Sequence, residues 1–171
     1  MESRELLLTA FDNIEQAVRG AVEGIDAGLL TARVDPEANT LAWLVWHLTR
    51  VQDDHVAEVA GRAQAYTEEG WADRFALPFP ADAIGYGFSN EQVGQVQVSD
   101  PQLLVDYHAA VHARTAEFLR TVSADDLDRV VDERWDPPVT LGVRLVSVIG
   151  DDLQHAGQAA YLRGVLERTR G

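Results

Sequence analysis

The fold of this chain is decided by the stretch from Thr140 to Arg168, which reads TLGVRLVSVIGDDLQHAGQAAYLRGVLER. Its inward-facing positions recur at alternating steps of three and four, which is the spacing of one face of an α-helix. These positions are Leu141, Leu145, Val148, His155, Ala159, Leu162 and Leu166. The stretch therefore predicts one amphipathic helix of about eight turns, long enough to run the length of a helical bundle.

Three earlier segments show the same spacing. They cover roughly Glu2–Ala27, Thr40–Ala63 and Ser99–Val122. Gly28 is expected to end the first helix, because glycine is the usual residue just after a helix C-terminus. Asn39 or Thr40 is expected to cap the second helix. Pro101 suits the first position of the third helix, where its missing N–H has no helical partner in any case.

The connection between the second and third predicted helices is unusually long. Residues Tyr66–Ser99 are rich in glycine and proline and show no sustained helical period, although short helical pieces are expected near Thr67–Arg74 or Asn90–Gly94. A connection of this length allows the two flanking helices to run parallel. A second break falls at Asp132–Pro138, and no strand pattern is visible. We therefore expect an all-α, four-helix bundle with a long crossover between helices 2 and 3, in one domain over residues 1–171.

Composition excludes several classes of function. Asp and Glu total 28 against 14 basic residues, so the formal net charge is -14. An acidic chain of this kind is poorly suited to nucleic acid or to an anionic membrane surface. The absence of cysteine excludes disulfides, thiolate metal sites and cysteine nucleophiles. Neither a signal peptide nor an apolar run of about 18–20 residues is seen, so a cytoplasmic protein is expected.

Candidate metal ligands occur on the second and fourth predicted helices. Asp151 and His155 are four residues apart and share one helical face, which makes them a chelating pair. Asp152 could replace Asp151 on spacing alone. His47 borders the apolar stripe of the second helix and could supply a third ligand. Three protein ligands with one open position are typical of catalytic zinc, and the same set also suits nickel, cobalt or ferrous iron.

Other interpretations of these residues remain open from spacing alone. A single histidine on an apolar face is more often a hydrogen-bonded core residue than a metal ligand. The third helix carries a rival pair, His108 and His112, also four residues apart. Ala109 stands where a metalloprotease motif of this spacing has glutamate. We interpret the rival pair as surface or pocket lining.

Three short motifs carry a resemblance to a known family. They are Trp46-His47-Leu48, His155-Ala156-Gly157-Gln158 and Tyr161-Leu162-Arg163. Together with the helix order they resemble the DinB/YfiT-like superfamily of metal-binding four-helix bundles, and in particular the mycothiol-dependent maleylpyruvate isomerases, in which an acid replaces one of the usual histidines. The resemblance implies that His47, Asp151 and His155 are the metal ligands, with zinc or nickel as the expected metal.

The same resemblance implies a function. Related proteins are transferases or isomerases that use a low-molecular-weight thiol such as mycothiol or bacillithiol, together with a small second substrate, and they imply a homodimer. A bound metal would lower the pKa of the thiol sulfur, so a chain without cysteine is compatible with this chemistry. Arg50 and Arg163 are candidate anchors for a carboxylated substrate, because arginine binds carboxylates bidentately. The alternative is that both are ordinary helix residues in contact with solvent.

Two other functions are weighed against the thiol-dependent enzyme. One is a non-catalytic binding or dimerisation module whose metal site is structural or vestigial. The other is metal-dependent hydrolysis, for which Asp54 is the candidate general base.

The aromatic residues of the crossover are Trp71, Phe75, Phe79, Tyr86 and Phe88. They are interpreted either as a lid over the metal or as anchors that hold the crossover on the bundle.

Overall fold

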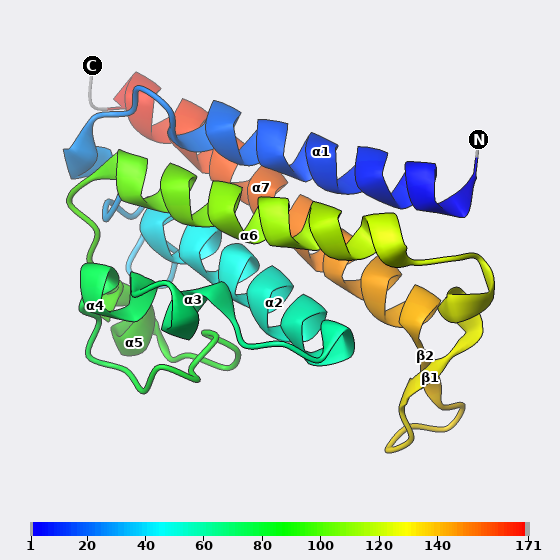
Figure 1. The fold of residues 1–171 in the computed structure, drawn as a ribbon. Helices are drawn as coiled ribbons and strands as arrows, with labels where there is room; N and C mark the ends of the chain where they lie inside the picture. The colour runs from blue at the N-terminus through cyan, green and yellow to red at the C-terminus, as the bar shows by residue number, and fades with distance from the viewer. Residues whose placement is uncertain (1, 170–171) are drawn as a thin grey trace.

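The computed structural model describes residues 2–169. Four long helices form a bundle, namely α1 (Ser3–Val22), α2 (Leu41–Ala60), α6 (Pro101–Thr121) and α7 (Leu141–Thr169). In Figure 1 the colour gradient shows that α2 and α6 run in one direction and that α1 and α7 run in the other. The long connection between α2 and α6 makes this parallel pair possible. The prediction of an all-α four-helix bundle with a long crossover is confirmed.

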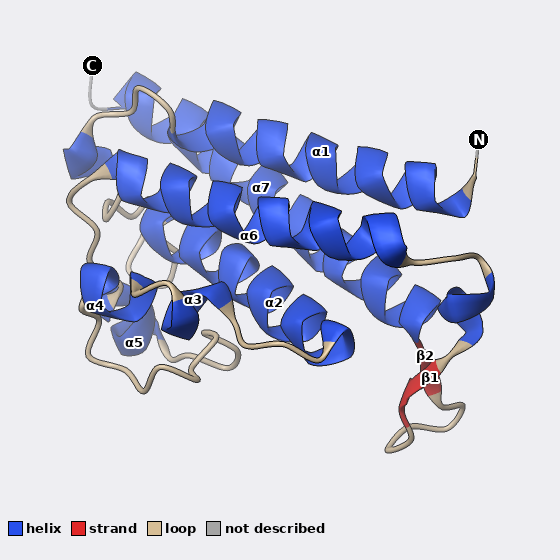
Figure 2. Ribbon diagram, in the orientation of Figure 1, coloured by secondary structure: helices blue, strands red, loops and turns tan. Residues whose placement is uncertain are grey.

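Shorter elements complete the chain. They are η1 (Ala27–Leu29), α3 (Ala65–Glu68), α4 (Trp71–Phe75), α5 (Asn90–Gln95), η2 (Asp125–Asp128), β1 (Val130–Asp132) and β2 (Val139–Thr140). The two strands form a small antiparallel hairpin below the start of α7 (Figure 2). The expectation that no strand would form is wrong here. Strands of two or three residues are too short to show a recognisable alternation of apolar and polar residues in the sequence.

The starts of the helices follow the predicted capping chemistry. The Thr40 hydroxyl accepts a hydrogen bond from the Trp43 backbone N–H at 3.1 Å, so Thr40 rather than Asn39 is the N-cap of α2. The Asp100 carboxylate accepts from the Gln102 N–H at 2.9 Å at the start of α6. Each cap satisfies a backbone donor that has no partner inside its helix.

Two helices end earlier than expected, each beside a glycine. Gly61 adopts a left-handed conformation with φ of 66° and ends α2 at Ala60. The first helix ends at Val22, just before Gly24 with φ of 71°, so the expected stop at Gly28 is wrong. Glycine tolerates this conformation without the steric cost of a Cβ atom, and so it sets the position of the turn.

Helix α2 lies at the centre of the structure. Every residue from Leu41 to Asp53 is buried. The other bundle helices cover one side of α2, and the crossover with α3, α4 and α5 covers the other, as Figure 1 shows. The polar side chains of α2 are therefore removed from water and must find partners inside the protein.

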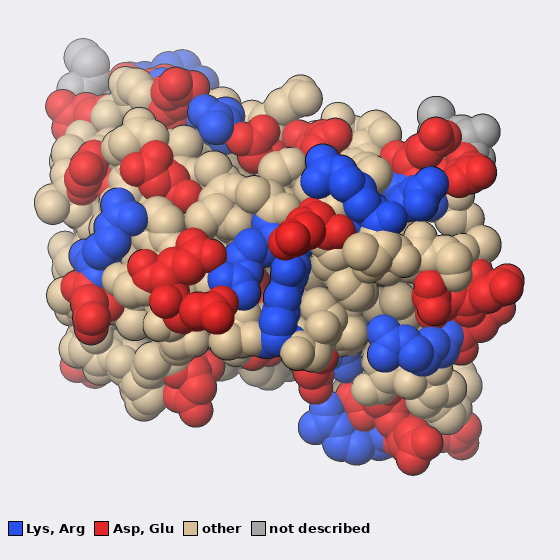
Figure 3. Space-filling view, in the orientation of Figure 1, with Lys and Arg blue, Asp and Glu red and all other residues tan. Residues whose placement is uncertain are grey.

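The surface is rich in acidic groups. Figure 3 shows carboxylates interspersed with arginine over the visible face. Arg114 of α6 forms ion pairs with Glu68 at 2.7 Å and Glu69 at 2.8 Å, which fastens the end of α3 to the bundle. Within residues 2–169, no helix is both long and apolar enough to cross a membrane.

One histidine of the rival pair lies deep in this core. His108 is 1% exposed, and its Nδ1 lies 3.1 Å from the Thr49 hydroxyl oxygen. That hydroxyl donates to the Val45 carbonyl, so it accepts from the imidazole N–H. The Nε2 atom has no hydrogen-bond partner in the described part of the chain. Burial lowers the pKa of His108 to about 3, with smaller contributions from the charges of His112 and Arg19.

We expect this histidine to make the fold sensitive to acid. The unfolded chain binds a proton at His108 near the ordinary pKa of about 6.5, whereas the folded chain does not until pH is near 3. The free energy of unfolding should therefore fall by roughly 1 kcal/mol for each pH unit between about 6 and 4. Urea unfolding of the wild type and of His108→Asn, which keeps a donor for Thr49, measures this. Equal pH slopes for the two proteins would contradict the prediction.

Candidate metal centre

Three side chains from two antiparallel helices converge at one point. His47 comes from α2, and Asp151 and His155 come from adjacent turns of α7. Each offers a ligand atom, and these atoms all lie within 4.8 Å of one another. The two imidazole ring centres are 5.0 Å apart, and Asp151 Oδ1 lies 3.7 Å from His155 Nε2. The structure thus brings together the three residues that were expected to be metal ligands.

Hydrogen bonds orient both imidazoles toward this point. His47 Nδ1 lies 2.5 Å from the Ile84 carbonyl, to which it donates. His155 Nδ1 lies 2.9 Å from Gln158 Oε1 and donates to it. A neutral imidazole that donates from Nδ1 carries its free lone pair on Nε2, which is the atom that faces the site. Partners of this kind are typical of metal-ligating histidines, since they hold the ring in the coordinating orientation.

The position of His47 depends on the crossover and on a neighbouring indole. The Trp43 ring stacks on the His47 ring with centres 4.5 Å apart. Gly85, with φ of 90°, follows Ile84, and a Cβ atom there would lie 2.9 Å from His47 Nδ1 and 3.0 Å from the Trp46 ring. Only glycine lets the backbone come this close, so Gly85 is needed for the carbonyl of Ile84 to reach the imidazole.

The charge state of the three groups fits a divalent cation. Burial lowers the pKa of His47, which keeps its imidazole neutral as a ligand requires. Asp151 Oδ2 is buried and has no hydrogen-bond partner within residues 2–169. A buried carboxylate oxygen without a partner is costly, and a cation would supply the missing interaction. Two imidazole nitrogens and one carboxylate are a common ligand set for catalytic zinc.

The other candidate ligands lie elsewhere. Asp152 is fully buried in the interior, and burial raises its pKa well above the usual range, so it is a neutral acid. His108 is enclosed in the core, and His112 Nε2 faces Asp12 of α1 at 3.1 Å. Among the described residues, none of these three joins the ligand group.

A cavity reaches the ligand group from the surface. It has a volume of about 400 Å³, and both His47 and Asp151 line it. A larger pocket of about 770 Å³ lies beside it, and the two share His55, Arg134 and Arg144 as lining residues. Two of the three ligand residues therefore lie on the wall of an accessible space rather than in a closed core.

Comparison with known proteins identifies the family of this chain. A family model described as mycothiol S-transferase matches residues 6–168. This chain belongs to that family. The match confirms the resemblance that the sequence motifs suggested, and it makes a mycothiol-dependent, transferase-like function the expected one.

One solved structure shows the same fold. It is described as a conserved protein from Enterococcus faecalis, and it shares 30% sequence identity with this member of the mycothiol S-transferase family. The alignment covers 95% of this chain and 96% of the other, with a TM-score of 0.89. No curated protein matches the chain.

Arg50 does not have the surroundings of a substrate anchor in this family member. Its side chain is fully buried, and its guanidinium donates to the carbonyls of Ala81 and Ala83 and to Gln64 Oε1, at 3.0, 3.2 and 2.8 Å. It also lies 3.5 Å from Asp53. These contacts tie the crossover to α2. They leave Arg50 a structural role, because its charge does not face a pocket that a substrate could enter.

Arg163 is likewise occupied elsewhere. It donates to the carbonyls of Gly20 and Glu23 at 3.1 and 2.9 Å, and it pairs with Glu167 at 2.8 Å. It therefore caps the C-terminal end of α1. Because Arg163 is two helical turns beyond His155, it lies about 12 Å farther along α7. The interpretation of Arg163 as a substrate anchor is not supported.

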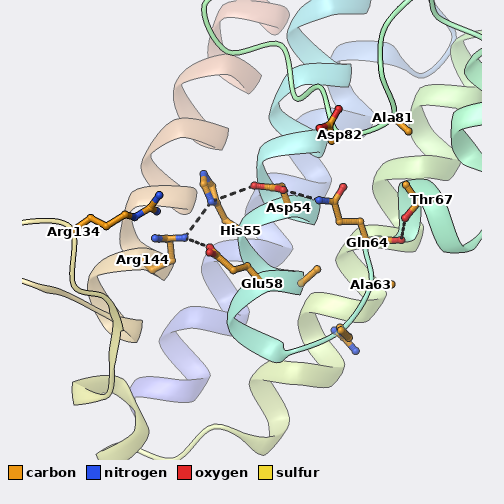
Figure 4. Close-up of a pocket in the computed structure, with 12 residues that line it drawn as sticks. Asp54, His55, Glu58, Ala63, Gln64, Thr67, Ala81, Asp82, Arg134 and Arg144 are labelled. Atoms are coloured by element: carbon orange, nitrogen blue, oxygen red, sulfur yellow. Dashed lines mark hydrogen bonds and ion pairs between the residues drawn. The ribbon is translucent and has the colours of Figure 1, made fainter.

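Asp54 lines the larger pocket rather than the cavity beside the ligands. Figure 4 shows it pointing toward Gln64, whose amide nitrogen donates to Asp54 Oδ1 at 2.6 Å. Asp54 Oδ2 lies 3.6 Å from His55 Nδ1. This position does not favour Asp54 as the general base of a hydrolase centred on the metal ligands.

Two residues of the junction between the pockets had no role assigned from the sequence. Arg144 donates to Glu58 at 2.6 Å and to Asp132 at 3.3 Å, and it lies 3.3 Å from His55 Nδ1. Figure 4 shows Arg144, Glu58 and His55 gathered between α2 and α7. The one available signal was the spacing of eight residues between His47 and His55, which places both on the same face of α2.

The aromatic residues of the crossover divide into two groups. Trp71 and Phe75 are buried, and Phe79 and Phe88 pack against the core, where they approach the Trp46 ring. These four hold the crossover on the bundle. Tyr86 is different, since it is 87% exposed and lines the cavity at the ligand group.

Proposed function

We propose that this protein is a metal-dependent S-transferase that joins a mycothiol-type thiol to an electrophile. The family match supports a thiol-dependent transferase in general terms. The observation that carries the proposal is the placement of His47, Asp151 and His155 around one point, with His47 and Asp151 on the wall of an open cavity. An open ligand group is typical of catalytic metal sites, whereas structural sites are closed by protein ligands.

The chain's own residues hold and orient the proposed site. His47 and His155 offer Nε2, and Asp151 offers its carboxylate, to a divalent cation for which zinc or nickel is proposed. A cation held there would supply the Lewis acidity that lowers the pKa of a thiol sulfur. Neutral imidazoles and a single carboxylate leave such a site with net positive charge, which favours the anionic form of the thiol.

The proposed reaction balances without a further reactant. The sulfur forms a bond to an electrophilic carbon, the leaving group departs with the bonding electrons, and the thiol proton passes to water. The sulfur comes from the cosubstrate, since the chain has no cysteine. The homodimer stays a prediction of the family resemblance.

The alternatives are less well supported by the geometry. A non-catalytic module with a vestigial site would be expected to close its ligands with apolar side chains, but a cavity of about 400 Å³ meets them here. An isomerase would use the same thiol site, and the family match favours group transfer.

The proposal predicts metal-dependent consumption of thiol. Metal-free protein is loaded with zinc or nickel and mixed with mycothiol and monobromobimane, whose thioether product is fluorescent. We expect the loaded protein to accelerate the reaction at least about 100-fold over buffer, with loss on chelation and recovery on reloading. The cobalt-substituted protein should show a sulfur-to-cobalt charge-transfer band when mycothiol is added. A loaded protein that neither accelerates the reaction nor shows the band would refute the proposal.

A further inference from the structure

One part of the cavity beside the ligand group is an apolar wall with an exposed aromatic rim, while the metal ligands and the residues around Arg144 line the rest. Tyr86, from the crossover, is 87% exposed, and Trp135, from the β1–β2 hairpin, is 66% exposed, yet both line this cavity. Val51, Val139 and Val148 form part of its wall. Large aromatic rings that two separate loops hold in solvent at the mouth of one cavity are typical of a binding site for an apolar ligand.

The larger pocket has only alanine as an apolar lining residue, and no aromatic ring other than the imidazole of His55. Its acidic residues are Asp54, Glu58 and Asp82, and its arginines are Arg62, Arg134 and Arg144. Each arginine is already paired with a carboxylate: Arg62 with Glu117, Arg134 with Asp132, and Arg144 with Glu58 and Asp132. Burial lowers the pKa of the lining residue His55, so its imidazole adds no charge. Within residues 2–169, no arginine pairs with Asp54 or Asp82, so the pocket offers carboxylate acceptors and disfavours an anion. A neutral molecule with many hydroxyl groups matches such a surface, because its hydroxyl groups can donate to these carboxylates.

The junction between the two spaces is a fixed group rather than an anion site. Arg144 is 9% exposed and already bonded to Glu58 and Asp132. Arg134 is held by two contacts of 2.8 Å to the Asp132 carboxylate. Neither guanidinium is left as an unpaired charge for a carboxylated substrate. A bound molecule that extends from the proposed metal ligands into the larger pocket would therefore pass His55 and these paired charges.

We propose that the two spaces divide the substrates of the reaction. The cavity with Tyr86 and Trp135 takes an apolar, aromatic electrophile, and the polar pocket takes the hydroxyl-rich portion of the thiol. The inference rests on the proposed function, because it assumes that a thiol and an electrophile meet at the ligand group. Mycothiol suits the arrangement chemically, since its cysteine sulfur is linked to a neutral portion of two hydroxylated rings.

Steady-state kinetics with paired substrates test the division. Trp135→Ala should raise the KM for an aromatic electrophile about tenfold and leave the KM for iodoacetamide within about twofold. Asp82→Ala should raise the KM for mycothiol about tenfold and leave that for N-acetylcysteine, which lacks the rings, within about twofold. Tyr161→Ala and Glu37→Ala are matched controls, because Tyr161 is an exposed aromatic residue and Glu37 an exposed acid outside both spaces. The division is overturned if a variant raises the KM for both substrates of its pair by the same factor.

Direct binding to the metal-free protein gives a second readout. Trp43, Trp46 and Trp71 are at most 7% exposed, so acrylamide quenching reports mainly on Trp135. Benzyl alcohol, an inert aromatic probe, should protect the wild-type fluorescence from quenching, and the protection should disappear in Trp135→Phe. Calorimetry should detect binding of N-acetylglucosaminyl-inositol, a neutral, sulfur-free analogue of mycothiol, with at least about fivefold weaker binding to Asp82→Ala.

The two readouts separate this inference from the proposed function. A loaded wild-type protein that consumes no thiol overturns the proposed function, and the binding assays then decide the division by themselves. Protection of Trp135 by benzyl alcohol, together with binding of N-acetylglucosaminyl-inositol that weakens in Asp82→Ala, supports it. Absence of either overturns it.

Discussion

Replacement of His47 or His155 by alanine is expected to abolish stoichiometric metal binding. Each variant removes one of three ligand atoms that lie within 4.8 Å of one another. The remaining two ligands leave the cation weakly held, so we expect the dissociation constant for zinc to rise at least about 100-fold. Gln158→Leu, which removes the acceptor of His155 Nδ1 but no ligand, should raise it by about 10- to 100-fold.

Competition with a fluorescent chelator, together with elemental analysis of the purified variants, measures this effect. His112→Ala is the matched control, since His112 belongs to the rival histidine pair and faces Asp12 rather than the ligand group. It should retain wild-type affinity. Full metal content in both His47→Ala and His155→Ala would remove the proposed centre. Loss of metal in the His112→Ala control alone would instead revive the rival pair on α6.

Replacement of Arg50 by methionine is expected to destabilise the fold by about 3–5 kcal/mol. The variant removes the donors that satisfy the carbonyls of Ala81 and Ala83, and it deprives Asp53 of its nearest cation. It also removes a guanidinium that lies 4.1 Å from the centre of the Tyr66 ring. The loss is large because Arg50, Asp53 and Tyr66 are buried, and an unpaired polar atom there keeps its full desolvation cost.

Urea unfolding gives the magnitude, and zinc affinity gives a second readout. Ile84 follows Ala83 directly and accepts from His47, so loosening of this part of the crossover should also weaken metal binding. Arg163→Met is the control, because Arg163 also donates to two backbone carbonyls but at a more exposed helix end. Its expected cost is about 1 kcal/mol. If the two variants lose similar amounts of stability, the structural role assigned to Arg50 is wrong.

Much of the fold and of the candidate site follows from local features of the chain. The stripes at steps of three and four set the four long helices, and Thr40 and Pro101 mark two of their starts, because helix geometry and capping depend on residues a few positions apart. The spacing of Asp151 and His155 puts both on one face of α7 for the same reason. His47 was placed beside them by family resemblance, not by spacing, since no local rule relates positions about a hundred residues apart.

Only the tertiary structure shows the interactions of side chains whose partners are distant in the sequence. By its sequence position, Arg50 is an ordinary helix residue. Its structural role follows only from the folded chain, in which the guanidinium donates to two carbonyls of the crossover. Asp151 and Asp152 are equivalent by spacing, but packing turns the first toward a cavity and the second into the core. The role of His55 depends on Arg144 arriving from another helix. Periodicity determines which face of a helix is buried, whereas the polar partner that a buried group finds depends on how separate segments meet.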